Sequence, residues 1–304
     1  MKKILVIGAS GFVGRALAQA FLAEGYAVRC LARNPAKVQD LATAGCEIVQ
    51  GDISDLASMQ QALKSVDAVY ISVHTLSPQN TDTATEDFMD VEINGLQNII
   101  TACRANEVRR VIYVTFLGAS PDGLSAWSRG RWKAEQLLLN SGLDVTVIRP
   151  GMIVGVGGQG FNMMVSNAKR RVAIIIGSGR NVFRCIAIND LVYFLVGVLK
   201  DQRAYGQCYD VGSDDILSNN QMIDIVAEVI GRRHPRKLHI PLSLLNIIAP
   251  LIERMGKLPK SSMKGMLDGM KTDMIGDPGP VRIILNRPLL SFRQAVERVL
   301  KGSS

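Results

Sequence analysis

The sequence contains few cysteines, and it lacks any long uninterrupted apolar run. The five cysteines of the 304-residue chain are scattered and include no Cys-x-x-Cys pair, so small buried thiols are expected instead of disulfides or a metal site. No stretch of about 18 consecutive apolar residues suggests a membrane-spanning helix. The apolar run at residues 4–7 reaches a glycine too early for a signal peptide. These absences together predict a cytoplasmic protein.

The sequence also has fewer acidic residues than basic ones. The chain has 35 lysine and arginine residues against 27 aspartate and glutamate residues, which gives a formal net charge of +8. The basic residues are dispersed, and their largest groups, at 109–110, 169–171 and 232–237, are short. We therefore expect no nucleic-acid partner, because a basic surface and an anionic ligand explain the balance. The apolar fraction of 47% allows a full hydrophobic core.

Strand-like apolar runs alternate with helix-like segments through the first half of the chain. The expected strands are residues 3–7, 27–32, 47–50, 68–73, 110–115 and 144–149, and the expected helices are 14–24, 59–64, 90–106 and 129–141. This alternation predicts βαβ units. The near-continuous apolar character of the strands indicates that helices cover both faces. The fold class is therefore α/β, a doubly wound parallel-sheet Rossmann fold.

The sequence changes character after Pro150. Five glycines between residues 151 and 160 indicate a loop, and helices are expected at 190–199, at 219–230 and, more weakly, at 292–300. We expect a Rossmann core at 1–155 and a smaller, mostly helical substrate lobe at 156–304. This lobe would cover the carboxyl ends of the strands, and some of its segments would return to the core.

Residues 242–255 form the most apolar segment of the second half. Three lysines follow it, at 257, 260 and 264, and Pro250 interrupts it. The segment is expected to be a core helix of the smaller lobe, or else a surface that contacts an anionic membrane or a partner. Pro250 argues against one long surface helix.

A glycine motif, Gly-x-x-Gly-x-x-Gly, follows the first strand and opens the first helix. Gly8 permits the tight turn, Gly11 lets the backbone approach a pyrophosphate at the helix N-terminus, and Gly14 lets the helix pack closely on the sheet. In this strand–turn–helix context the motif predicts a nicotinamide dinucleotide site. The loop residues expected to contact the dinucleotide are Gly8, Ser10, Gly11, Phe12, Val13 and Gly14.

The ends of the second and third strands are expected to bind the adenosine. An acidic residue after the second strand would select NAD through the 2′-hydroxyl, but this chain has Arg33 there, and we expect no carboxylate nearby that would repel a 2′-phosphate. Its guanidinium can bind a 2′-phosphate, so NADP(H) is the predicted cofactor, preferred over NAD(H). Asp52 can accept a hydrogen bond from the adenine amino group, and Ser54 or Asp55 can cap the next helix.

These residues together resemble the short-chain dehydrogenase/reductase superfamily in its atypical and extended branches. Within it, the chain is most similar to the NDUFA-type subunit of respiratory complex I and to NmrA-like proteins. The likeness covers nearly the whole chain. Besides the motifs above, it rests on Val91-Glu92-Ile93-Asn94-Gly95-Leu96-Gln97-Asn98, Val114-Thr115-Phe116-Leu117-Gly118-Ala119, Lys133-Ala134-Glu135, Arg149-Pro150-Gly151 and Cys208-Tyr209-Asp210-Val211-Gly212.

The resemblance implies a catalytic apparatus from which this chain departs. The superfamily uses a tyrosine four residues before a lysine on one helix face, and a serine or threonine after the fifth strand. Lys133 and Thr115 match this pattern and are the expected catalytic residues, but Arg129 stands at the tyrosine position. Tyr113 lies within the fifth strand and is expected to face the core. Lys133 can bind the ribose hydroxyls, and in NmrA-like reductases such a residue can also transfer the proton.

Four further residues are expected to border the cofactor. Ile53 lies beside Asp52, Val73 ends the fourth strand and His74 follows it, and Pro150 follows the sixth strand, where the resemblance places backbone beside the carboxamide. Glycines in the 155–158 loop could form a mobile cover over the substrate or a plain turn.

The function predicted from these features is an NADPH-dependent reductase of a small organic substrate. Two alternatives remain: a non-catalytic dinucleotide sensor or assembly factor, which the missing tyrosine favours, and, more weakly, a nucleotide-sugar epimerase or dehydratase. The oligomeric state does not follow from the sequence.

Overall fold

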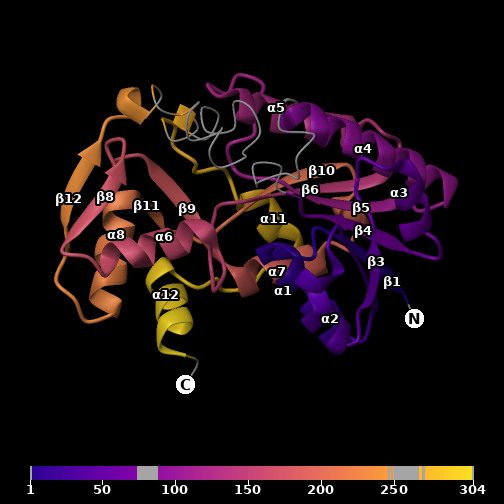
Figure 1. The fold of residues 1–304 in the computed structure, drawn as a ribbon, viewed down its shortest axis with the longest axis horizontal. Coiled ribbons are helices and arrows are strands. Elements are labelled where there is room, and N and C mark those ends of the chain that lie inside the picture. Colours follow the sequence, from indigo (N-terminus) through magenta and orange to yellow (C-terminus); the bar gives the residue numbers. More distant parts are fainter. Residues whose placement is uncertain are drawn as a thin grey trace.

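The computed structural model describes residues 2–73, 88–245, 247, 249, 267–268 and 271–302, except for the side chain of Phe88. Its first half alternates strands and helices (Figure 1). These elements are β1 (Lys3–Ile7), α1 (Phe12–Ala23), β2 (Ala27–Ala32), η1 (Pro35–Val38), α2 (Gln39–Thr43), β3 (Glu47–Gln50), α3 (Leu56–Ala62), β4 (Ala68–Ile71), α4 (Phe88–Ala105), β5 (Arg110–Val114), α5 (Ala126–Leu139) and β6 (Asp144–Pro150).

The second half contains further strands as well as the helices expected from the sequence. Its elements are β7 (Met152–Val154), α6 (Gln159–Ala168), β8 (Val172–Ile176), β9 (Val182–Ala187), α7 (Ile188–Gly197), η3 (Gln202–Ala204), β10 (Gln207–Val211), β11 (Ile216–Ser218), α8 (Asn219–Val229), β12 (Arg236–Ile240), α11 (Gly279–Ile284) and α12 (Phe292–Lys301). Among the residues described, no helix is both long enough and apolar enough to cross a bilayer.

A seven-stranded sheet forms the centre of the molecule. Its strand order is β10-β6-β5-β4-β1-β2-β3, and every pairing is parallel. The predicted doubly wound Rossmann fold is confirmed. The strand order reverses between β1 and β4, and the carboxyl ends of the strands at such a switch point form the usual ligand crevice of open α/β sheets. The sequence features singled out above follow these ends.

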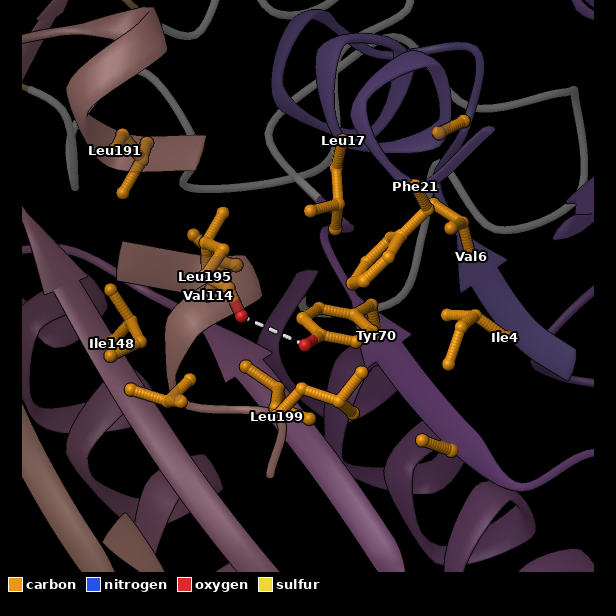
Figure 2. Close-up of a cluster of buried hydrophobic side chains, with 14 of the residues drawn as sticks. Ile4, Val6, Leu17, Phe21, Tyr70, Val114, Ile148, Leu191, Leu195 and Leu199 are labelled. Atoms are coloured by element: carbon orange, nitrogen blue, oxygen red, sulfur yellow. Dashed lines mark hydrogen bonds between the residues drawn. The ribbon is translucent and has the colours of Figure 1, made fainter. Parts of the chain in front are cut away.

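Two separate clusters of buried apolar side chains cover the two faces of this sheet. One joins α1 and α7 to β1, β4, β5 and β6, and Figure 2 shows Phe21 of α1 against Tyr70 of β4. The Tyr70 hydroxyl donates a 2.8 Å hydrogen bond to the Leu195 carbonyl of α7. The other cluster joins α3, α4 and α5 to the opposite face. Helix packing on both faces explains why the strands are continuous apolar runs.

A third cluster of buried side chains forms a smaller lobe beside the carboxyl ends of the sheet (Figure 1). It contains α6, α8 and α12, a three-stranded sheet in the order β11-β9-β7 and a two-stranded parallel sheet of β8 and β12. The sequence did not predict these short strands. The apolar run of β8 directly follows three basic residues and has no turn signal that separates it from a helix.

Candidate functional site

The glycine loop is fixed at the switch point by backbone contacts that exclude side chains. Gly8 has a φ of +89°, in the region that favours glycine, and a Cβ there would lie 2.3 Å from the Ser72 carbonyl oxygen after β4. A Cβ on Gly14 would lie 2.3 Å from the Gly8 carbonyl oxygen. The loop therefore joins β1, β4 and α1 at close range, and both positions require glycine.

Gly11 occupies the N-cap position of α1 and keeps the helix N-terminus open. It makes no side-chain capping hydrogen bond, so the first-turn amides remain directed outward. A Cβ on Gly11 would have one neighbouring atom within 4 Å, the Gly8 carbonyl oxygen at 3.2 Å. A larger side chain at this position would fill the open space in front of the helix N-terminus. An uncapped helix N-terminus beside a bare loop fits a pyrophosphate. The site can therefore accept a dinucleotide.

Arg33 follows β2 at the adenosine end of the crevice, and the structure corrects one expectation about it. Its side chain is about half exposed, but the Asp52 carboxylate lies 3.9 Å from Arg33 Nε. A carboxylate is therefore present in space although the neighbouring sequence has none, because β2 and β3 are adjacent parallel strands whose carboxyl ends meet. A 2′-phosphate would share Arg33 with Asp52.

The loop after β3 is held in place by its own polar side chains. Asp52 Oδ1 accepts hydrogen bonds from both the backbone and the hydroxyl of Ser54, and Asp55 caps α3 by accepting from the Ala57 amide. Of the two capping residues that the sequence allowed, Asp55 is the one used. The Asn98 amide of α4 donates to the Ile53 carbonyl at 2.9 Å. The loop thus presents Asp52 and Ile53 on a fixed backbone.

On the side where the nicotinamide is predicted, Val73 and Thr115 follow two neighbouring strands, and Pro150 is the last residue of a third. These strands are β4, β5 and β6, which lie in this order beyond β1. The Thr115 hydroxyl oxygen is buried and makes no hydrogen bond within the described residues. Pro150 accepts a hydrogen bond from the Leu117 amide through its carbonyl. His74 lies outside the described residues, so its role stays a prediction.

Phe12 connects the glycine loop to the glycine-rich loop of the second half. A Cβ on Gly155 would lie 2.6 Å from the Phe12 ring, and one on Gly158 would lie 3.1 Å from it. The 155–158 loop therefore packs on the Phe12 side chain at the start of α1. Glycine allows this close approach, which is a packing reason for the glycines that the sequence did not reveal.

Helix α5 places Lys133 and Arg129, the residue at the tyrosine position, on its exposed face. The Arg129 guanidinium donates to the Gly123 carbonyl at 2.6 Å and to the Leu124 carbonyl at 3.1 Å. Lys133 is exposed and lines an open groove of about 600 Å³ between α4 and α5, beside Gln97. The structure does not bring Lys133 together with Thr115, and the role of each stays a prediction.

A buried charged network lies behind Thr115, and the sequence did not single it out. Arg149 of β6 donates through Nε to the Glu135 carboxylate of α5 at 3.0 Å, and its Nη1 lies 3.8 Å from Asp210 of β10. Burial raises the pKa of Glu135, while Arg149 and the nearby Thr115 hydroxyl lower it. Burial also raises the pKa of Asp210. Glu135 and Arg149 belong to two of the family motifs in the sequence. That their side chains pair follows only from the fold, which brings α5 and β6 together.

Tyr113 faces the core, as the sequence predicted. Its hydroxyl donates to Glu92 of α4 and accepts a 3.0 Å hydrogen bond from Arg131 of α5. Arg131 and Glu92 also form an ion pair at 2.8 Å, with both side chains almost completely buried. Burial raises the pKa of the Tyr113 hydroxyl well above its ordinary value. Tyr113 is thus engaged in a structural triad and is not placed at the crevice.

An aromatic pair lines the segment between β5 and α5. Phe116, the residue after Thr115, stacks on Trp127 at the start of α5, with ring centroids 3.9 Å apart and planes 15° apart. The Ser128 hydroxyl donates a hydrogen bond to the Gly118 carbonyl, and this bond joins the start of α5 to the segment that follows β5. A stacked aromatic pair therefore follows Thr115 directly in the chain, while the Glu135–Arg149 network lies on the other side of the Thr115 hydroxyl.

Comparison with known proteins agrees with this site. Residues 8–173, more than half of the chain, match the family described as NAD(P)H-binding. The chain is 26% identical over 299 residues to (4-alkanoyl-5-oxo-2,5-dihydrofuran-3-yl)methyl phosphate reductase of Streptomyces griseus, with 95% of each chain covered. It is 25% identical over 253 residues to a mitochondrial NADH dehydrogenase subunit, alpha subcomplex subunit 9, of Arabidopsis thaliana. That match covers 80% of this chain and 61% of the relative.

A solved structure shows the same fold. The dTDP-glucose 4,6-dehydratase of Streptomyces venezuelae, in a structure with bound NAD, superimposes with a TM-score of 0.76 at 19% identity. The match covers 98% of this chain and 96% of the dehydratase. With the glycine loop at the switch point and the match over residues 8–173, the chain belongs to the NAD(P)H-binding family of extended and atypical short-chain dehydrogenase/reductase proteins with a Rossmann fold.

Proposed function

We propose that the protein is an NADPH-dependent reductase of a small organic substrate, and that it reduces a carbon–carbon double bond conjugated to a carbonyl group. The relative from Streptomyces griseus, which matches over nearly its whole length, is named as a reductase. The observation that carries the proposal is the Thr115 hydroxyl, which is buried at the carboxyl end of β5 and makes no hydrogen bond of ordinary length and angle among the described residues, although the Glu135 carboxyl lies close enough for Thr115 to lower its pKa. Such a donor can bind a substrate oxygen.

The choice of bond follows from the residue at the tyrosine position. Reduction of a ketone requires an acid at the forming alkoxide, and Arg129 offers none because its guanidinium is bonded to loop carbonyls. Reduction of a conjugated double bond instead places negative charge on the carbonyl oxygen, where a hydrogen-bond donor is sufficient. The carbon can then take its proton from water. When bound, the reduced dinucleotide would supply the hydride.

The residues of this chain then have distinct tasks in the proposal. Thr115 donates a hydrogen bond to the substrate oxygen, and the stacked Phe116 and Trp127 offer an apolar surface to the carbon skeleton of the substrate. The amides after Gly11 hold the pyrophosphate. Lys133 holds the ribose hydroxyls, which requires its side chain to leave the groove between α4 and α5.

Substitution of Thr115 tests the reaction. We expect the wild-type protein to oxidise NADPH with enones and quinones and to be slow with saturated ketones and aldehydes. Thr115→Val should lower kcat by about 10²- to 10³-fold, the usual cost of one oxyanion donor, while the NADPH Kd stays the same. Thr101→Val is the matched control, because that hydroxyl bonds the Gln97 carbonyl on the outer side of α4. Full turnover in Thr115→Val would contradict the assigned role.

A charge reversal at Arg33 tests cofactor choice. Arg33→Asp should weaken NADPH binding by about 10- to 100-fold, the value of charge-assisted hydrogen bonds of 1.5–3 kcal/mol. NADH should then bind more tightly than NADPH. Titration of both cofactors, with the exposed Lys64→Asp as a control of equal charge change, measures the effect. Equal affinity of the wild-type protein for both cofactors would remove Arg33 from the selection.

One observation favours a second candidate, a protein that binds the dinucleotide without catalysis. Lys133, the remaining match to the family's Tyr–Lys pair, is exposed in the outer groove. In that case the protein binds NADPH, no member of the substrate panel is reduced, and Thr115→Val changes nothing.

A further inference from the structure

The outer face of the two-stranded β8–β12 sheet is apolar and exposed. Ile174 of β8 pairs in register with Leu238 of β12, and their side chains are 42% and 56% exposed. Val172 is 45% exposed on the same face. The alternate residues Ala173 and Ile175 are buried in the core of the smaller lobe. The β8 strand is therefore apolar on both faces, although one of them stays exposed among the residues that the structure describes.

This exposed apolar surface continues past the carboxyl ends of the strands. A Cβ on Gly177, directly after β8, would lie 3.5 Å from the Leu242 side chain, so the chain after β12 returns to the same end. Leu244 and Ile247 follow there, 53% and 77% exposed. We call Val172, Ile174, Leu238, Leu244 and Ile247 the apolar surface. These five exposed apolar side chains lie on the two paired strands and on the segment that follows β12.

Six exposed basic residues gather at the other end of the same two strands. The two strands are parallel, so the segments that precede them lie together at their amino ends. Hydrogen bonds join these segments: the Arg232 guanidinium donates to the Lys169 carbonyl at 2.7 Å, and the Arg236 amide donates to the Arg171 carbonyl at 3.0 Å. We call this group the basic end. Its members are Lys169, Arg170, Arg171, Arg232, Arg233 and Arg236.

The basic end is not neutralised by acidic side chains. Within the part of the chain that the structure describes, none of its six members has a carboxylate within ion-pair distance. The neighbouring carboxylates have other partners. Asp224 binds Lys237 at 2.7 Å, and Glu228 binds Arg293 and His234. The local excess of positive charge is therefore available to an external anion.

We propose that the apolar surface and the basic end together dock on an anionic lipid bilayer. Apolar side chains beside clustered lysine and arginine residues are the combination that binds an interface rich in acidic headgroups. A nucleic acid would use the cations but not the adjoining aliphatic face. Figure 1 shows β8 and β12 at the left end of the molecule, on the far side of the smaller lobe from the Rossmann sheet. Docking there leaves the dinucleotide crevice accessible.

Co-sedimentation with vesicles tests this surface. The wild-type protein should pellet with vesicles that mix phosphatidylglycerol with phosphatidylcholine, remain in the supernatant with phosphatidylcholine alone, and be released by high salt. Arg171→Glu with Arg233→Glu should lower the partition coefficient by about 30-fold or more, since each basic residue near the surface contributes on the order of fivefold. Lys2→Glu with Lys64→Glu is the matched control, with an equal charge change on the Rossmann core.

The apolar contribution is tested separately. Ile174→Asn with Leu238→Asn keeps all charges and should also reduce binding to the anionic vesicles. Both positions are exposed, so unchanged thermal unfolding and NADPH affinity confirm that these variants fold. Full recovery of the wild-type protein in the supernatant would overturn the proposal, as would equal losses in the basic-end variant and its control. If only the charge-reversal variant loses vesicle binding and the Ile174→Asn with Leu238→Asn variant binds normally, the interaction is non-specific electrostatic attraction. That result would also overturn the proposal.

Discussion

Replacing Gly11 with valine is expected to abolish dinucleotide binding, with an affinity loss of at least about 100-fold. Gly11 caps α1 without a side chain, and the first-turn amides behind it are the groups that would bind the pyrophosphate. A branched side chain would occupy the space of the phosphates. Its φ of −81° is ordinary, and a Cβ there meets only the Gly8 carbonyl at 3.2 Å, so the variant should still fold. Titration with NADPH and thermal unfolding measure the two effects separately.

Two other glycine substitutions calibrate this result. Gly14→Val should damage the fold itself, because its Cβ would lie 2.3 Å from the Gly8 carbonyl, and binding is lost together with stability. Gly160→Val should affect neither, since no atom lies within 4 Å of a Cβ there. Normal binding by a folded Gly11→Val protein would show that this loop is not the phosphate site.

The Rossmann half could be predicted from the sequence because its signals are local. Strands β1 to β6 each contain a short apolar run bounded by polar or glycine residues, and the glycine motif has a fixed spacing after β1. Helix α5 was expected at 129–141 and begins three residues earlier, because Ser125 caps it by accepting from the Ser128 amide. The error lies at a helix boundary, where hydrophobic periodicity carries little information.

The remaining features depend on contacts between distant residues. The strands β8 and β12 pair with each other although α7, β10 and α8 separate them in the chain, and the alternation of polar and apolar residues in β12 is too short to identify a strand on its own. The Arg33–Asp52 pair exists because β2 and β3 are neighbours in space. Lys133 matches a motif by spacing, but the side of α5 that it occupies is set by the packing of Ala134 and Leu138 against the sheet.

Replacing Arg131 with methionine is expected to destabilise the protein by about 3–5 kcal/mol, the usual cost of removing one partner from a buried ion pair. Arg131 of α5 and Glu92 of α4 are 2% and 0% exposed, and their charged groups are 2.8 Å apart. Methionine fills a similar volume but leaves the Glu92 carboxylate without this cation. The Tyr113 hydroxyl also loses a donor, so β5, α4 and α5 are all affected.

Chemical denaturation of three further variants separates this effect from lost packing. Arg109→Met removes an ion pair to Asp144 in which the arginine is 65% exposed, and it should cost less than about 1 kcal/mol. Glu92→Leu combined with Arg131→Met should be more stable than Arg131→Met alone, because no uncompensated charge remains buried. Glu92→Leu alone completes the double-mutant cycle and should itself be strongly destabilising. If Arg131→Met and Arg109→Met destabilise the protein equally, the buried triad does not hold α4 and α5 to the sheet through its charges.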